Sequence, residues 1–161
     1  MKKHRSLMVS GAALTFVTAR VVRRYQQDAK AARRRLDAVD MKSVPTSVGD
    51  VEYAESGTGE PLFVIHGIFG GRDAGIISFG GILPDRRIIA PSRFGYLGSA
   101  MPADATPELQ ADAFAELLDH LAVDRIDVIA YSAGATSALQ LAPFASIAEG
   151  DDACLWTGTT S

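Results

Sequence analysis

The stretch Ile126–Gln140, IDVIAYSAGATSALQ, decides the fold of this 161-residue chain. It opens with a run of apolar, mostly β-branched residues, which is typical of a buried strand. The residues A-Y-S-A-G follow immediately, so the connection is a tight turn and not a loop. Small or helix-favouring residues then continue as far as Pro143, which cannot extend a helix. The sequence therefore predicts a strand, a tight turn at Ser132 and a helix.

A serine on such a turn is arranged for nucleophilic attack. A sharp strand-to-helix turn lifts the serine clear of the sheet in a strained backbone conformation, and the close passage of strand and helix requires small neighbours, here Ala130 and Gly134. The N–H of Ala133 opens the helix, where it would face a developing oxyanion. Ser132 is thus the candidate catalytic nucleophile. For this pentapeptide alone, a buried serine in an ordinary strand-to-helix turn is the alternative.

A second glycine-rich stretch follows the predicted strand Pro61–His66, PLFVIH. The apolar centre of this strand predicts burial on both faces, as in the parallel strands of α/β proteins. The strand runs directly into H-G-I-F-G-G, residues 66–71, and glycines at the carboxyl end of a buried strand let backbone amides approach a bound group. The stretch lacks the Gly-Lys-Ser/Thr of a phosphate-binding loop and the G-x-G-x-x-G pattern of dinucleotide sites. It is therefore a candidate ligand-binding loop of another kind.

Shorter elements complete the predicted domain, which should begin near Val48 after a boundary at Ser43–Pro45. Val51–Ser56 alternates apolar and polar residues like an edge strand, and Arg87–Pro91 is a third short strand. A helix with one apolar face should begin after a cap at Thr106. The order strand, glycine loop, strand, helix, strand, turn, helix predicts parallel strands joined by right-handed crossovers.

Three further polar side chains are candidates: Arg93, Tyr96 and His120. Arg93 and Tyr96 lie in a turn-rich loop after the third strand, where they would line a pocket or, as the commoner alternative, decorate the surface. His120 lies near the end of the predicted helix, where a histidine complements the helix dipole. The sequence therefore predicts a structural role for His120.

The amino-terminal region differs in charge from the rest of the chain, because 11 of the 16 lysines and arginines lie in the first 42 residues. Residues 1–22 have a basic start, an apolar stretch and small residues that signal peptidase favours, so they predict a signal peptide or membrane anchor and a membrane-associated or exported protein. The apolar stretch is shorter than the roughly 20 residues of a membrane span. One alternative is a continuous amphipathic helix through Tyr25, whose following arginine-rich face would lie on anionic lipid, with membrane association through residues 1–35, or be solvated. The alternative location is the cytoplasm. Residues 23–47 predict a basic helical tether.

Composition excludes several classes of partner. The net charge of −3 gives no reason to expect nucleic acid as a partner. The single cysteine, Cys154, cannot form an internal disulfide, and no Cys/His spacing resembles a zinc site. The sequence predicts no metal, no cofactor and no nucleic-acid partner, and it carries no indication of an oligomeric state.

The two glycine-containing turns together resemble those of the α/β-hydrolase superfamily. H-G-x-x-G-G after one strand and A-Y-S-A-G after a later strand are similar in order and spacing to its oxyanion loop and nucleophile elbow, over roughly residues 48–142. The resemblance implies an α/β fold with a partial parallel sheet flanked by helices. It also implies serine-nucleophile hydrolysis of an ester or similar small acyl substrate, with Ser132 as nucleophile. The oxyanion and substrate-binding residues that it implies are His66, Gly67, Ile68, Phe69 and Ala133.

The end of the chain departs from this resemblance. The superfamily's triad order places an acid and then a histidine after the serine, yet all three histidines precede Ser132. Residues 143–161 show no strand or helix periodicity and predict an irregular tail at a truncated or frame-shifted end, which would leave Ile126–Ala130 as an unpaired edge. Two hypotheses remain: a serine-hydrolase fragment with impaired activity, or a non-catalytic remnant or half-domain that binds a partner through this edge.

Overall fold

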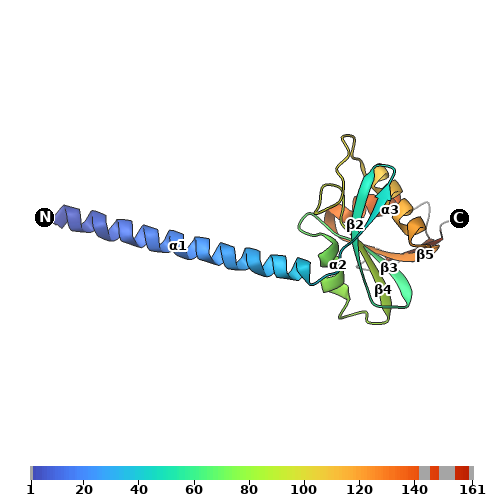
Figure 1. Cartoon of the computed structure of the whole chain (residues 1–161), viewed down its shortest axis with the longest axis horizontal. Coiled ribbons are helices and arrows are strands. Elements are labelled where there is room, and N and C mark those ends of the chain that lie inside the picture. Colours follow the sequence, from blue (N-terminus) through green and yellow to red (C-terminus); the bar gives the residue numbers. More distant parts are fainter. Residues whose placement is uncertain (1, 142–145, 149–154, 160–161) are drawn as a thin grey trace. The chain divides into compact units, whose positions relative to one another are not determined.

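The computed structural model describes residues 2–141, 146–148 and 155–159, and the chain divides into two units, Met1–Ala38 and Val39–Ser161. The first unit is one helix, α1 (Lys2–Asp37), drawn in blue in Figure 1. An exposed ion pair between Arg24 and Asp28, 3.1 Å apart and one turn apart, supports the helix. The helix runs without a break across the boundary predicted at residue 22, as the continuous-helix alternative expects. Among the described residues, no helix is long and apolar enough to cross a membrane.

The second unit is built on one mixed sheet with strand order β1-β2-β4-β3-β5-β7-β6. Its strands are β1 (Lys42–Thr46), β2 (Gly49–Ser56), β3 (Glu60–Ile65), β4 (Arg86–Pro91), β5 (Arg125–Ala130), β6 (Ser146–Ala148) and β7 (Leu155–Thr159). Its helical segments are α2 (Arg72–Phe79), α3 (Pro107–His120), the 3₁₀ turn η1 (Ser132–Gly134) and α4 (Ala135–Gln140).

The predicted α/β fold with a partial parallel sheet flanked by helices is confirmed, and the sheet as a whole is mixed. Only β3 pairs in parallel, with β4 on one side and β5 on the other. β1, β2 and β4 are joined by antiparallel pairing. For β1 and β2 the reason is the length of the connection: a tight turn joins them, which antiparallel pairing permits and parallel pairing does not.

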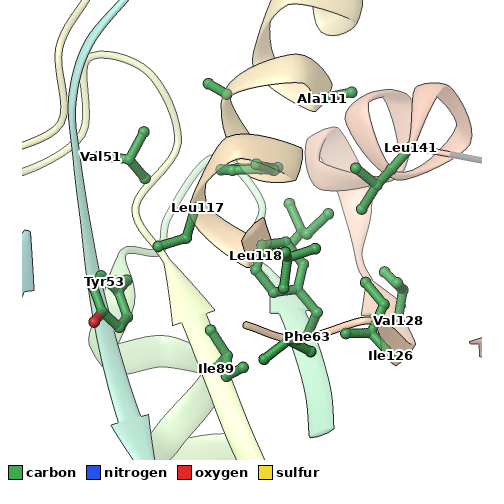
Figure 2. Packing of buried hydrophobic residues seen from close by; sticks show 14 of the residues in the cluster. Val51, Tyr53, Phe63, Ile89, Ala111, Leu117, Leu118, Ile126, Val128 and Leu141 are labelled. Carbon is green, nitrogen blue, oxygen red and sulfur yellow. The ribbon is translucent and has the colours of Figure 1, made fainter. Parts of the chain in front are cut away.

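Apolar side chains pack on both faces of the sheet. Along β3, Phe63 and Ile65 join the cluster beneath α3, which Figure 2 shows, while Leu62 and Val64 join a second cluster with α2 residues. This alternation is the two-residue period of a strand. All four side chains are at most 1% exposed, so the predicted burial of this strand on both faces is confirmed. Phe63 also meets Phe114 edge to face, with ring centroids 5.3 Å apart.

Two corrections concern the start of the sheet. The sheet begins at Lys42, within the predicted tether and boundary, because Pro45 is compatible with β1 at the edge of the sheet, where Val44 is buried. β2 is not an edge strand, since it lies between β1 and β4. The alternating pattern misled the prediction because Glu52 is buried too, in an ion pair with Arg72.

A third correction concerns the far edge. β7 pairs antiparallel with β5, from Arg125 opposite Thr159 to Val128 opposite Trp156, and β6 pairs with β7. The predicted unpaired edge and entirely irregular tail are therefore wrong. Exposed strand backbone groups pair readily with another strand whatever its side-chain pattern, so periodicity could not reveal this pairing. The remaining residues of the predicted tail lie outside the described part of the chain.

Candidate functional site

Ser132 has the geometry of a strained, accessible turn residue. It follows β5 directly, begins η1, is exposed, and has a φ of +53°. A left-handed conformation of this kind costs about 1–2 kcal/mol for a residue with a Cβ, so the surrounding structure must hold it. Part of that structure is Gly134, where a Cβ would lie 2.6 Å from Ile65 O and 2.7 Å from His66 O. The predicted need for a small residue at this position follows from that backbone contact.

The glycine loop after β3 lies directly against this serine. A Cβ on Gly67 would lie 3.0 Å from Ser132 Cβ and 3.5 Å from its Oγ. The two segments meet because β3 and β5 are parallel neighbours and Ile65 pairs with Ala130, so both strands end at the same edge of the sheet. Tertiary pairing thus brings together the two stretches that the sequence singled out.

His66 is fully buried, and both of its ring nitrogens bond to the backbone. Nε2 accepts a hydrogen bond from Arg93 N–H at 2.9 Å, so Nδ1 carries the proton and donates to Gly67 O at 2.7 Å. Burial lowers the pKa of His66 and keeps the ring neutral. His66 therefore holds backbone in place, and it has no free nitrogen with which to accept the proton of Ser132.

The bond from His66 also orients the glycine loop after β3. The Gly67–Ile68 peptide is trans, so the Ile68 N–H points away from the carbonyl oxygen that His66 holds. Within the described residues, neither Ile68 N–H nor Phe69 N–H donates a backbone hydrogen bond. Both side chains are exposed. The N–H of Ala133, in the first turn of η1, belongs to the amides that a helix start leaves without an intrahelical partner. Ala133 follows Ser132 directly, and Ile68 follows Gly67, which packs against Ser132.

A buried polar cluster anchors the loops behind the site. Glu52 Oε1 accepts from Arg72 Nη1 at 2.7 Å and from Ser92 Oγ at 3.2 Å, and Ser92 Oγ accepts from Arg72 N at 3.1 Å. Ser99 Oγ accepts from Glu52 N at 2.9 Å and donates to Ser92 O at 2.7 Å. The cluster ties β2, the start of α2 and the loop after β4 together, which fixes the end of the glycine loop where α2 begins.

No described histidine is placed to act as a base for Ser132. His120 is exposed at the end of α3, just before β5 begins. Ser132 follows the other end of β5. Because a strand of six residues is about 20 Å long, the two residues lie at opposite ends of this strand. The side chain of His4 is not among those described. The predicted structural place of His120 at the helix end agrees with this geometry.

Asp73 is a site neighbour that sequence reasoning missed. Burial, and after it the charge of Asp73, raises the pKa of Tyr131, the residue before the serine. Asp73 also acts on His66, against the larger effect of burial. The only signal in the sequence is its position directly after the glycine loop. No group of described residues could hold a metal ion.

Arg93 and Tyr96 both contact His66, at the start of the glycine loop. The Tyr96 ring packs edge to face on His66 with centroids 4.8 Å apart, and Arg93 Cζ lies 5.8 Å from the Tyr96 ring. Arg93 also lines a cavity of about 200 Å³, as the pocket alternative for this residue expects. Gln110 and Ser137 line the same cavity, and sequence reasoning missed both because each lies inside a helix pattern.

Comparison with known proteins gives the following similarities. No family model matches the chain. Over 94 residues it is 34% identical to the uncharacterized hydrolase YcgS of Bacillus subtilis (strain 168), an overlap of 56% of this chain and 32% of that protein. It is similar to an α/β hydrolase fold protein from Nakamurella multipartita, with a TM-score of 0.59, 34% identity, and coverage of 64% of this chain and 36% of that one.

A thermophilic esterase from Thermogutta terrifontis is also similar. Its TM-score is 0.56, its identity is 28%, and the match covers 65% of this chain and 40% of the esterase. The chain thus spans about a third of the length of the first two relatives and somewhat more of the third. In each case, the similarity concerns a part of a longer hydrolase.

Proposed function

We propose that this chain, a member of the α/β-hydrolase superfamily, supplies the nucleophile and oxyanion hole of a serine hydrolase that acts on an ester or similar small acyl substrate. One observation carries the proposal: Ser132 is exposed at φ +53° with the backbone of Gly67 packed against it. A strained serine between a strand and a helix, next to loop amides, is the arrangement that acyl transfer requires. The similarity to an esterase supports the choice of substrate class.

The proposed reaction uses Ser132 Oγ and two backbone amides. Oγ attacks the carbonyl carbon while its proton passes to a general base, and the carbonyl electron pair moves onto oxygen. The N–H groups of Ala133 and of Ile68 or Phe69 donate to that oxyanion. When this tetrahedral intermediate collapses, the alcohol leaves and takes up the proton from the base. An acyl group remains on Ser132. Water then gives a proton to the base and attacks the acyl carbon; the bond from that carbon to Oγ breaks, the acyl group leaves as a carboxylic acid, and Oγ takes up the proton.

The general base is not among the described side chains. His66 has both nitrogens engaged and a pKa lowered by burial, and His120 lies at the other end of α3. The proposal therefore includes a histidine and an acid that lie outside the described side chains. The chain alone should be a poor catalyst, because an oxyanion hole and binding without a base give only about 10³–10⁴-fold acceleration over water.

Chemical rescue tests the role of Ser132. In a fluorophosphonate probe, the serine oxygen bonds to phosphorus and fluoride leaves, so labelling reports an activated nucleophile. We expect negligible labelling of the purified chain, and labelling that rises with added imidazole, which serves as an external base. The increase should vanish in Ser132→Ala and persist in Ser78→Ala, which removes another exposed serine.

Two results would contradict parts of the proposal. Imidazole-dependent labelling that survives in Ser132→Ala, or no labelling at any imidazole concentration, would exclude Ser132 as the nucleophile. Strong labelling without imidazole that is lost in Ser132→Ala would keep the nucleophile but show that the chain already holds a base. Hydrolysis of p-nitrophenyl acetate by the same three proteins provides a second readout.

A further inference from the structure

The helix α1 exposes an apolar face. Its side chains are described from Thr15 onward, and the helix continues unbroken to Asp37 (Figure 1). Val17, Val21 and Tyr25 follow one another at intervals of four residues, so they lie on one face of the helix. The three side chains are 57%, 62% and 73% exposed. Apolar side chains that are both exposed and contiguous are typical of an interaction surface.

The opposite face of α1 is basic. Since a helix has about 3.6 residues per turn, Arg20, Arg23, Lys30 and Arg34 lie on the side away from the apolar face, and all four are exposed. Residues 15–37 contain seven lysines and arginines against two aspartates, a net charge of +5. An apolar face opposed to a face of lysine and arginine is typical of helices that lie in the interface of a membrane.

One acidic residue, Asp28, interrupts the apolar face, and an arginine balances its charge. Asp28 is seven residues after Val21 and therefore shares its face. Arg24 Nε lies 3.1 Å from Asp28 Oδ2. Arg24 also lines a groove along α1 together with Val21 and Tyr25, so a cation borders the apolar face. The guanidinium group has five N–H donors and can contact a phosphate while it pairs with Asp28.

The two units of the chain carry opposite charge. Residues 39–161 contain six lysines and arginines against 17 aspartates and glutamates, a net charge of −11, whereas α1 is positive. An anionic surface therefore attracts α1 and repels the second unit. Within this chain, electrostatic attraction to such a surface must come from α1.

We propose that α1 binds the surface of a membrane that contains anionic lipid. The apolar face enters the boundary between headgroups and acyl chains, and the basic side chains contact the lipid phosphates. A nucleic acid would pair with the arginines but leave Val17, Val21 and Tyr25 in water. A second copy of α1 would bring together two helices of net charge +5 and place Asp28 in the seam between them. The inference does not depend on the role of Ser132.

Vesicle flotation of the full-length chain tests the inference. Vesicles of phosphatidylcholine alone are compared with vesicles of phosphatidylcholine mixed with phosphatidylglycerol, which adds negative charge. We expect at least about tenfold tighter binding to the mixed vesicles, since each arginine near an anionic surface strengthens binding about fivefold. Raising the salt from about 0.1 M to 1 M shortens the Debye length from roughly 10 Å to 3 Å and should weaken this binding. Equal binding to the two kinds of vesicle, or no flotation with either, would overturn the inference.

Val21→Gln tests the apolar face, and Phe16→Gln is its matched control. Glutamine favours a helix at least as much as valine or phenylalanine does, so neither change should unfold α1. Phe16 is exposed and lies four residues before Arg20, on the basic face. Val21→Gln should weaken binding to the mixed vesicles by about fivefold or more, whereas Phe16→Gln should change it by less than about twofold. Equal effects of the two variants would show that the apolar face does not meet the lipid.

Two charge variants test the contacts with the lipid phosphates. Asp28→Asn removes the negative charge from the apolar face and should tighten binding about fivefold. Arg20→Gln combined with Arg23→Gln should weaken binding at least about tenfold. Arg125→Gln removes an exposed arginine from the second unit and should change nothing. Weaker binding of Asp28→Asn, or a loss in Arg125→Gln as large as in the double variant, would contradict the proposed orientation of α1.

Two measurements distinguish the lipid from the other partners. If the chain binds a DNA duplex as tightly as the mixed vesicles, and Val21→Gln affects neither, α1 is a nucleic-acid element and the inference is wrong. In the absence of vesicles, Val21→Gln should leave the sedimentation coefficient of the chain unchanged. A dimer that Val21→Gln dissociates would assign the apolar face to a second copy of the chain and would also overturn the inference.

Discussion

Replacing Ser132 with glycine should give a more stable protein than replacing it with alanine, which inverts the usual order. The reason is the φ of +53° at this position. Both variants remove the hydroxyl, so their difference isolates the backbone. Alanine keeps the Cβ that makes a left-handed conformation unfavourable, and glycine does not.

The magnitude follows from two opposing costs. The left-handed conformation costs alanine about 1–2 kcal/mol. Glycine avoids that cost but loses about 0.5–1 kcal/mol more backbone entropy on folding. The difference leaves Ser132→Gly more stable than Ser132→Ala by about 0.5–1 kcal/mol. At Ala135, where φ is −61°, the same exchange of alanine for glycine should instead destabilise by about 1 kcal/mol.

Urea unfolding of the full-length chain, followed by the fluorescence of its one tryptophan, measures both differences. The dependence of the unfolding free energy on urea concentration must be the same in all variants, so that a change in the midpoint concentration of urea reports a change in stability. Ala122→Gly is the matched positive control, because Ala122 is exposed, has φ +51° and ends α3 far from Ser132. It should stabilise by a similar amount. If Ser132→Gly proves about 1 kcal/mol less stable than Ser132→Ala while Ala122→Gly is stabilising, the strained turn at Ser132 does not exist in solution.

Three further predictions test the surroundings of the site. Gly134→Ala should lower the free energy of unfolding by about 1–3 kcal/mol, because the new Cβ would meet backbone oxygens, whereas Gly81→Ala, with nothing within 4 Å, should be neutral in the same urea experiment. Since burial lowers the pKa of His66, the unfolded chain binds its proton more readily; stability should fall as the pH drops below about 6.5, and less steeply in His66→Gln. Deleting residues 143–161 removes β7, exposes the edge of β5 and should cause concentration-dependent light scattering; a clear, monomeric truncated protein would show that the pairing is dispensable.

Local sequence was sufficient for the elements that carry the site. The strand, turn and helix around Ser132 were predicted because a buried strand that meets small residues and then a helix pattern has few other solutions. The start of α3 was predicted because Thr106 caps an amide three residues away, a contact that neighbouring sequence contains. α2 escaped notice, since it is short and begins within a glycine-rich stretch.

Pairing between distant segments decided the rest. The burial of Glu52 depends on Arg72, the neutral state of His66 depends on an amide of Arg93, and the orientation of the Gln110 amide depends on Phe94. Each partner lies 16 or more residues away along the chain. Hydrophobic periodicity reports which way a side chain points within its own element, and it contains nothing about which polar group will lie opposite. The sequence by itself therefore determined where the tight turn at Ser132 lies. The tertiary structure decided that the buried histidine holds the glycine loop, because the amide that bonds to its Nε2 comes from Arg93, 27 residues away.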